Sequence, residues 1–313
     1  MSLAFVFPGQ GSQAVGMGQA LAEAFPVARH TLQEVDDALE QHLSRLMFEG
    51  PEDELRLTAN AQPALMAASL AALRVFEQEG GRPLAERAAF VAGHSLGEYS
   101  ALAAAGALEL ADTARLLRRR GEAMQEAVPV GEGAMAALLG LELDAAEEIA
   151  QEAAEDQVCA AANDNAPGQV VLSGHREAID RAIELAKGRG AKRAIQLPVS
   201  APFHCSLMAP AADVMADALA TVSIKMPAVP LVANVTAARL SDPDEIRRKL
   251  VEQVTGKVRW RESVAYMASQ GVETTVELGA GKVLTGLSKR IDHGLGAVAA
   301  GTPEELEKLL QQL

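Results

Sequence analysis

The strongest constraint on the fold is a serine flanked by glycines, in the run Gly93-His94-Ser95-Leu96-Gly97. An uncharged segment, 88–92, precedes this run, and an alanine-rich segment that favours a helix follows it to Ala105. Strand, tight turn and helix in this order are typical of a nucleophile elbow, which lifts a serine hydroxyl clear of both flanking elements. The free N–H groups and dipole of the helix N-terminus favour an oxyanion there. The alternative is a turn whose serine only caps a helix.

The composition is that of a globular, acidic protein. Apolar residues make up 49% and aromatic residues only 3%, which favours α/β or all-α packing over a β-sandwich. With 28 basic and 42 acidic residues, the formal charge of −14 argues against binding to nucleic acid. Cys159 and Cys205 match neither a metal-site spacing nor a disulfide framework.

Neither the first residues of the sequence nor its longest uncharged run has the pattern of a signal peptide or a membrane span. The first eight residues lack the basic segment of a signal peptide, and the longest run without Asp, Glu, Lys or Arg, 194–212, contains three prolines. We therefore expect a soluble cytoplasmic protein with no membrane segment.

Strand-like and helical patterns alternate along the chain. The order of predicted strands and helices changes between about residues 130 and 200. In this part, strands are predicted at 134–139, 158–162, 169–173 and 192–197, helices at 144–154 and 176–187, and a turn at 163–168. The order βαββαβ is that of a ferredoxin-like domain. We expect this small domain at 129–198, inserted into a larger α/β domain formed by 1–128 and 199–313.

The larger domain is predicted from the remaining periodicity. Strands are expected at 3–7, 88–92, 229–234, 274–278 and 297–299, and helical periodicity covers 18–48, 60–79, 110–128, 244–253, 261–270, the segment after Lys282 and the end of the chain from Pro303. The strand at 88–92 and the helix that follows Ser95, which flank the elbow, belong to this larger domain.

Three consecutive arginines, Arg118, Arg119 and Arg120, lie in a predicted helix. Steps of four residues from Leu116 lead to Arg120 and then to Met124, so Arg120 lies on the apolar stripe. The other two share their faces with charged residues and are expected in solvent. An inward guanidinium needs a partner. That partner is either a protein carboxylate or a ligand carboxylate held by two parallel hydrogen bonds, and both remain open.

The general base for Ser95 has to be chosen among six histidines. His204 lies in the proline-framed loop 200–206, at the expected joint between the domains, where a cleft is expected. His94 adjoins the serine in the chain and points away from it. The others lie in helical or terminal segments: His30, His42, His175 and His293. His204 is therefore the candidate, and a loop histidine at a helix N-terminus is the alternative.

Two glycine-rich loops resemble nucleotide-binding motifs, but neither loop has all the residues that its motif requires. The loop 8–13 after the first strand lacks the third glycine of a dinucleotide fingerprint, and Gly279-Ala280-Gly281-Lys282 lacks the first glycine and the final Ser or Thr of a phosphate loop. The first loop is better used to bring a backbone N–H and the polar Gln10 beside the elbow. A plain turn is its alternative.

These residues make the chain similar, almost end to end, to the malonyl-CoA:acyl carrier protein transacylases of fatty-acid synthesis. The resemblance rests on short motifs in a fixed order: Phe7-Pro8-Gly9-Gln10-Gly11-Ser12-Gln13, Gly93-His94-Ser95-Leu96-Gly97-Glu98-Tyr99, Arg120-Gly121, Phe203-His204-Cys205, Gln253 and Glu277-Leu278-Gly279-Ala280-Gly281-Lys282-Val283-Leu284. It implies an α/β fold in which a ferredoxin-like βαββαβ domain is inserted into a hydrolase-like parallel-sheet core.

The resemblance also implies roles for individual residues. Ser95 would be the nucleophile and His204 its base, while Arg120 would hold the free carboxylate of the malonyl group. The backbone N–H groups of Gln10 and Leu96 would form the oxyanion hole.

Further positions follow from the same resemblance. The main-chain carbonyl at Gln253 would orient the histidine, so that a dyad replaces a triad. Asn163 and Asn165 would line the cleft, and Phe203 would crowd an α-methyl group and so favour malonyl. No metal and no cofactor beyond the two substrates is implied.

The predicted reaction moves malonyl from malonyl-CoA to the phosphopantetheine thiol of acyl carrier protein, by a monomer. The alternatives are a serine thioesterase or esterase, a trans-acting acyltransferase of polyketide synthesis, and a non-catalytic subunit that binds carrier protein. An acidic carrier protein would need a basic patch on this acidic chain. The candidates are Lys187, Arg189, Lys192 and Arg193 on the small domain, with Lys282, Lys289 and Arg290 opposite.

Overall fold

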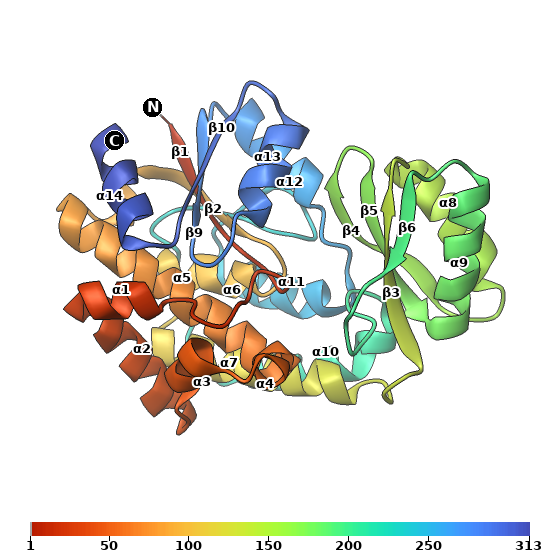
Figure 1. Cartoon of the computed structure of the whole chain (residues 1–313), viewed down its shortest axis with the longest axis horizontal. Helices are drawn as coiled ribbons and strands as arrows, with labels where there is room; N and C mark the ends of the chain where they lie inside the picture. The colour runs from red at the N-terminus through yellow and green to blue at the C-terminus, as the bar shows by residue number, and fades with distance from the viewer. Residues whose placement is uncertain (1) are drawn as a thin grey trace.

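Two β-sheets organise residues 2–313, which this computed structural model describes (Figure 1). The larger sheet has the order β10-β9-β1-β2-β7-β8. Its strands are β1 (Leu3–Phe7), β2 (Ala88–Gly93), β7 (Leu231–Val232), β8 (Arg239–Leu240), β9 (Thr274–Leu278) and β10 (Gly296–Ala300). All neighbouring strands are parallel except β7 and β8. The predicted α/β class with a parallel-sheet core is confirmed.

Strand β1 is central because both of its faces are apolar. Leu3, Phe5 and Phe7 pack into one cluster with the long helix α5 (Thr58–Gly80), while Ala4 and Val6 pack into a second cluster on the other face. The second cluster includes residues of α12 (Trp260–Ser269) and α13 (Val283–Ile291). A strand buried on both faces has to be apolar throughout, as this one is.

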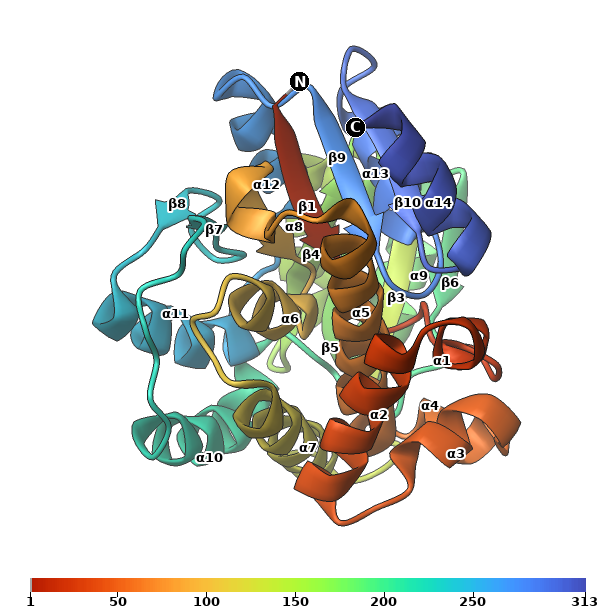
Figure 2. The same ribbon diagram turned by 90° about the vertical axis from the view of Figure 1, so that its left-hand side faces the viewer.

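The remaining helices of the larger domain pack either on this sheet or on one another. They are α1 (Gln19–Ala24), α2 (Pro26–Leu39), α3 (Leu43–Glu49), α4 (Glu52–Arg56), α6 (Gly97–Ala104), α7 (Leu110–Glu126), α10 (Ala209–Ala220), α11 (Pro243–Thr255) and α14 (Pro303–Gln312). Helix α5 packs against both α2 and α7 (Figure 2). Within residues 2–313, the helices are too short or too polar for one to cross a bilayer.

The helical pattern predicted over 18–48 is broken in the structure into three helices. Pro26 starts a new helix at α2, because proline fits the first helical position and cannot continue a preceding helix. Glu40 then ends α2 in a left-handed conformation with φ 51°. The amphipathic period is the same in each piece, which is why it does not show the breaks.

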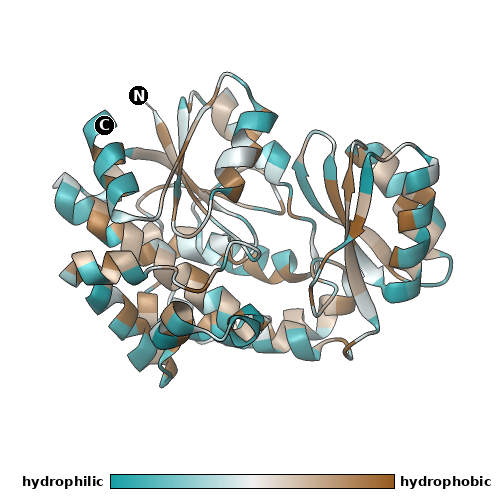
Figure 3. Ribbon diagram, in the orientation of Figure 1, coloured by the Kyte–Doolittle hydropathy of each residue, from teal (hydrophilic) through white to brown (hydrophobic). Residues whose placement is uncertain are grey.

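The smaller sheet has the order β4-β5-β3-β6, and all of its pairs are antiparallel. Its strands are β3 (Gly133–Leu139), β4 (Cys159–Ala166), β5 (Gln169–His175) and β6 (Arg193–Gln196). Helices α8 (Leu143–Ala154) and α9 (Arg176–Gly188) cover one face, with their apolar sides inward and polar sides outward (Figure 3). This is the predicted ferredoxin-like arrangement. The domain limits at 129 and 198 stay a prediction.

Two strand predictions are wrong in detail. Strand β4 continues to Ala166 through the segment 163–166, which was predicted as a turn. Two backbone partners account for this. Strand β5 pairs with β4 as far as Ala166, and on the other side Val258 donates to Ala162 O at 2.8 Å and accepts from Asp164 N at 2.9 Å. Strand β7 is shorter than predicted, because Asn234 turns its N–H to the Glu98 carboxylate instead of continuing the sheet.

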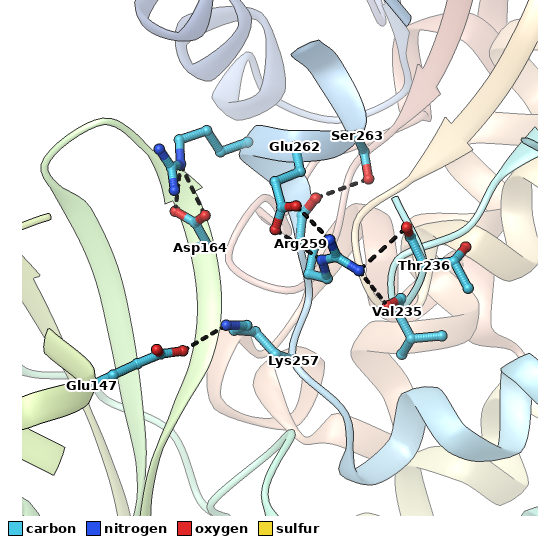
Figure 4. Close-up of polar contacts among 9 residues, drawn as sticks. Glu147, Asp164, Val235, Thr236, Lys257, Arg259, Glu262 and Ser263 are labelled. Carbon is cyan, nitrogen blue, oxygen red and sulfur yellow. Dashed lines mark hydrogen bonds and ion pairs between the residues drawn. The ribbon is translucent and has the colours of Figure 1, made fainter. Parts of the chain in front are cut away.

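Ion pairs reinforce this junction between β4 and the segment before α12. Arg261 Nε donates to both carboxylate oxygens of Asp164, at 3.0 and 2.9 Å, and the Asp164 side chain is only 1% exposed. Lys257 pairs with Glu147 of α8 at 2.7 Å (Figure 4). The small sheet is thereby attached to the chain segment that follows α11.

Candidate active site

The turn between β2 and α6 has the geometry of a nucleophile elbow. Ser95 adopts a left-handed conformation with φ 53°, which non-glycine residues rarely adopt. A Cβ atom at Gly93 would lie 1.9 Å from the backbone of Gly97, and one at Gly97 would lie 2.2 Å from Phe7 O. Only glycine fits at either position. Strand β2 and helix α6 therefore approach each other closely at the turn.

Asn234, just after β7, fastens this strained turn to the sheet. Its Oδ1 accepts from the backbone N–H of Ser95 at 2.8 Å, and its Nδ2 donates to Gly93 O at 2.7 Å. The side chain is fully buried. These two hydrogen bonds, one to the apex residue Ser95 and one to Gly93 at the end of β2, help to compensate for a backbone conformation that costs about 1–3 kcal/mol.

His204 lies against the serine, as predicted. Its Nε2 is 2.7 Å from Ser95 Oγ, and its Nδ1 is 2.9 Å from Gln253 O and 3.1 Å from Gly256 O. Carbonyl oxygens only accept, so Nδ1 carries the proton and Nε2 is left free to accept from the serine hydroxyl. His94 contacts Asn165 Oδ1 at 2.8 Å instead. Ser95 and His204 are therefore in hydrogen-bond contact, in the geometry that a serine nucleophile and its general base require.

The environment keeps this imidazole neutral. Burial, and to a lesser extent the positive charge of Arg120, lower the pKa of His204 to about 3. A neutral Nε2 can accept a proton throughout the range in which most enzymes work.

We therefore expect kcat/KM for acylation of Ser95 to lack an acid limb near pH 6.5. Because His204 stays deprotonated, the value should change by less than about twofold between pH 5 and pH 8. The measurement is the rate of covalent labelling by an acyl-CoA donor across that range. A tenfold fall per pH unit below 6.5 would show an ordinary histidine instead.

Arg120 reaches into the same site. It is 1% exposed, and its Nη2 donates to Ser95 Oγ at 3.2 Å and to Gln253 Oε1 at 2.8 Å. Its Nη1 donates to Gln62 Oε1 at 2.9 Å. Within residues 2–313, all of these partners are neutral, and the guanidinium contacts no carboxylate. The inward position predicted from helical periodicity is present, without the structural ion pair that was one of its two explanations.

The two neighbouring arginines differ from each other. Arg119 is exposed, as predicted. Arg118 is half-buried and donates to Asn60 Oδ1 at 2.9 Å and to Gln41, so the prediction that it lies free in solvent is wrong. The reason is that α7 is also packed against α2 and α5, and Arg118 lies at that seam.

A cavity of about 360 Å³ surrounds the serine. Five predicted site residues line it along with Ser95 and His204: Gln10, Leu96, Arg120, Asn163 and Phe203. The backbone N–H groups of Gln10 and Leu96 donate to no atom of residues 2–313, so both are available beside the hydroxyl. Apolar side chains complete the wall: Met124, Met135, Leu197 and Val199.

Two further predicted site residues lie behind this wall: Asn165, which was expected to line the cleft, and Gln253, whose main-chain carbonyl was expected to orient His204. Gln253 is fully buried and contacts Arg120 and His204, and Asn165 holds His94 through its side chain. Neither is among the residues that line the cavity. Instead, they hold residues that line the cavity: Gln253 holds Arg120 and His204, and Asn165 holds His94.

A model of the acyl transferase domain family matches residues 4–300. The chain belongs to this family. This acyl transferase is 50% identical over 308 residues to the malonyl CoA-acyl carrier protein transacylase of Escherichia coli (strain K12), with 98% of each chain covered. The predicted resemblance is confirmed.

Solved structures give the same assignment. The acyl-carrier-protein-S-malonyltransferase from Bartonella henselae is 56% identical, with a TM-score of 0.97 over 100% of this acyl transferase and 99% of that chain. A malonyl-transacylase solved in complex with a type II PKS acyl-carrier protein is 44% identical, with a TM-score of 0.97 and full coverage of both chains.

Three polar residues of this site were not predicted: Gln62, Asn234 and Glu98. Each is buried and bonded to a predicted residue or to its backbone. Gln62 had a usable signal, since it is a polar residue within an otherwise apolar helical stretch. Asn234 and Glu98 offered none, because their partners lie far away in the chain.

Proposed function

We propose that this acyl transferase moves the malonyl group from malonyl-CoA to the phosphopantetheine thiol of acyl carrier protein, for fatty-acid synthesis. The observation that carries the proposal is the buried Arg120 guanidinium, which contacts no carboxylate of residues 2–313 and lies 3.2 Å from Ser95 Oγ. A buried cation beside a nucleophile favours an acyl group that brings its own carboxylate.

The geometry supports a two-step exchange. Ser95 Oγ attacks the thioester carbonyl while its proton passes to His204 Nε2, which lies 2.7 Å away. The free N–H groups of Gln10 and Leu96 stabilise the tetrahedral oxyanion. The C–S bond then breaks, and the coenzyme A sulfur takes the proton from His204. The carrier-protein thiol attacks the malonyl-serine ester by the same steps in reverse, which frees Ser95.

The cavity wall supports a preference for malonyl. Phe203 precedes the base in the chain, is 7% exposed and lines the cavity beside Ser95. An α-methyl group on the acyl chain would have to fit against this ring. We propose that Phe203 disfavours methylmalonyl for this reason.

Every group that this exchange needs is in the chain or in its two substrates, the malonyl thioester and the carrier-protein thiol. We therefore propose that the enzyme uses no metal and no organic cofactor. We also propose that it acts in the cytoplasm as a monomer. The same chemistry would serve polyketide synthesis, and the similarity to a malonyl-transacylase of that class keeps it as a second candidate.

A direct test is to mix the protein with malonyl-CoA and holo acyl carrier protein and identify the products by mass. We expect malonyl-carrier protein and free coenzyme A. Free malonate as the main product would indicate a thioesterase instead. If the intact protein gains no malonyl mass without carrier protein, the covalent route is wrong.

Part of the predicted basic patch is free for docking of an acidic carrier protein. Lys187, Arg189 and Lys282 are in ion pairs with the chain's own glutamates. The other four candidates, Lys192, Arg193, Lys289 and Arg290, pair with no carboxylate of residues 2–313.

Lys192, Arg193 and Arg290 lie near one another, whereas Lys289 lies beside β10 and α14. Arg193 and Gln169 both pair with Leu139 across the small sheet, and Arg290 of α13 reaches Gln169 and Pro167 O. The patch therefore joins the small sheet to the large domain at one end of the sheet. We propose it as the docking surface.

Charge reversal tests this surface. Replacing Lys192 and Arg193 together with glutamate should raise KM for carrier protein about tenfold, because an attraction becomes a repulsion. Labelling of Ser95 by malonyl-CoA should be unchanged. Arg119→Glu on α7, which reverses another exposed charge, is the matched control. Unchanged kinetics with carrier protein would remove Lys192 and Arg193 from the docking surface.

A further inference from the structure

A buried carboxylate lies behind the active site without touching the catalytic pair. Glu98, in the first turn of α6, is 1% exposed. Its Oε2 accepts from Asn234 N at 3.0 Å and from Gln253 Nε2 at 2.9 Å. Its Oε1 has no partner within residues 2–313. Because Glu98 makes no contact with His204, it is not the acid of a triad.

The contact with Gln253 fixes the direction of that amide. Gln253 Nε2 donates to Glu98 Oε2 and also to Ser95 O at 2.9 Å. An amide with its nitrogen held by two acceptors has to turn its oxygen the other way. That oxygen, Oε1, accepts from Arg120 Nη2 at 2.8 Å. A reversed amide would put N–H groups against the guanidinium.

The contact with Asn234 acts on the elbow in the same way. Glu98 holds the backbone of Asn234, and the side chain of that asparagine holds Ser95 N and Gly93 O. One carboxylate oxygen therefore supports two chains of hydrogen bonds. One chain ends at the guanidinium and the other at the nucleophile.

We infer that Glu98 is a positioning residue for acyl-group selection: its Oε2 orients Gln253 and Asn234 so that the Arg120 guanidinium and the Ser95 hydroxyl are held at the spacing that a carboxylate-bearing thioester requires. This inference rests on the proposed malonyl transfer. It adds to that function a residue that touches neither substrate nor the catalytic histidine.

The role needs an acceptor at Oε2 and does not need a full negative charge. Burial raises the pKa of Glu98 to about 7, so both protonation states are accessible near neutral pH. A proton on Oε1, the oxygen without a partner, leaves Oε2 free to accept. Glutamine has the same shape as that protonated form and keeps the acceptor, whereas alanine removes it.

The test compares Glu98→Gln and Glu98→Ala with malonyl-CoA and acetyl-CoA as donors. The measured quantity is the rate of Ser95 acylation by each donor, with the ratio of kcat/KM values as the selectivity. Glu98→Gln should stay within about threefold of the natural protein for both donors. Glu98→Ala should lose about 30-fold with malonyl-CoA and much less with acetyl-CoA, because a misplaced guanidinium no longer meets the carboxylate.

Ser100→Ala is the matched control, since Ser100 is a fully buried polar residue of the same helix whose hydroxyl has no partner within residues 2–313. It should leave both rates unchanged. A general loss of stability would slow both donors alike, so the malonyl-to-acetyl ratio separates positioning from unfolding. Thermal melting of each variant checks that the folded protein is being measured.

Gln253→Met provides a second route if Glu98→Ala does not fold. It keeps the main-chain carbonyl that binds His204 and removes the amide between Glu98 and Arg120, so it should lower the malonyl-to-acetyl ratio about tenfold. Folded Glu98→Ala or Gln253→Met protein with unchanged selectivity would overturn the inference. So would Glu98→Gln as impaired as Glu98→Ala. Absence of malonyl transfer by the natural protein would instead overturn the proposed function.

Discussion

Replacing Ser95 with alanine should reduce malonyl transfer on the order of 10⁴-fold or more, and the protein should no longer gain malonyl mass. The hydroxyl oxygen is the only atom lost. It lies 2.7 Å from His204 Nε2 and 3.2 Å from Arg120 Nη2, so the base and the cation both lose their common partner. Intact mass after mixing with malonyl-CoA measures the adduct, and transfer to carrier protein measures the turnover.

The control for this variant is again Ser100→Ala, which removes a buried hydroxyl five residues along without touching the cavity. It should still form the adduct. If Ser95→Ala protein acquired the malonyl mass at the natural rate, another nucleophile would have to be sought.

Replacing Arg120 with alanine should change which acyl group is used. Transfer of malonyl is expected to fall about 10³-fold, because the carboxylate would enter a buried site without its cation. Transfer of acetyl, which has no carboxylate, should be retained or increased. The kcat/KM values for malonyl-CoA and acetyl-CoA, measured on the same preparation, give the ratio.

Arg119→Ala is the matched control, because Arg119 is the adjacent arginine and is exposed. It should keep the natural preference for malonyl. Equal losses with both donors in Arg120→Ala would mean that the guanidinium supports the structure of the site and does not select the substrate.

Local features of the site could be predicted from the sequence. The elbow depends on five consecutive residues, and the inward direction of Arg120 depends on one period of a single helix. His204 was identified by its place at a joint between domains, which is also a feature of the nearby chain. In each case the sequence pattern that supports the prediction lies close to the residue in the chain.

The supporting residues could not be found in this way. Asn234 is 139 residues from Ser95, and Gln62 is 58 residues from Arg120. Their partners are defined only once the sheet and α5 are packed together. The polar Gln62 stands out within an apolar helical stretch, but Asn234 and Glu98 have no local pattern that distinguishes them from ordinary core polar groups.

The same reason explains the error in β4. The run Asn163-Asp164-Asn165-Ala166-Pro167-Gly168 has the composition of a turn. Its first four residues are extended because β5 pairs with them on one side, and Val258, nearly a hundred positions later, supplies hydrogen bonds on the other. The turn propensity was overridden by strand partners on both sides, and only one of them, β5, lies in the local sequence.

The way in which His204 is oriented has a consequence for how this enzyme tolerates change. Both acceptors of its Nδ1 proton are peptide carbonyls, which every amino acid carries. Substitution at position 253 therefore deletes neither acceptor. A Cβ atom at Gly256 would lie 2.9 Å from Glu252 O, and an inserted or deleted residue directly after α11 would displace the Gly256 carbonyl. The orientation of His204 therefore depends on the path of the backbone at 253–256 and not on the side chain at position 253.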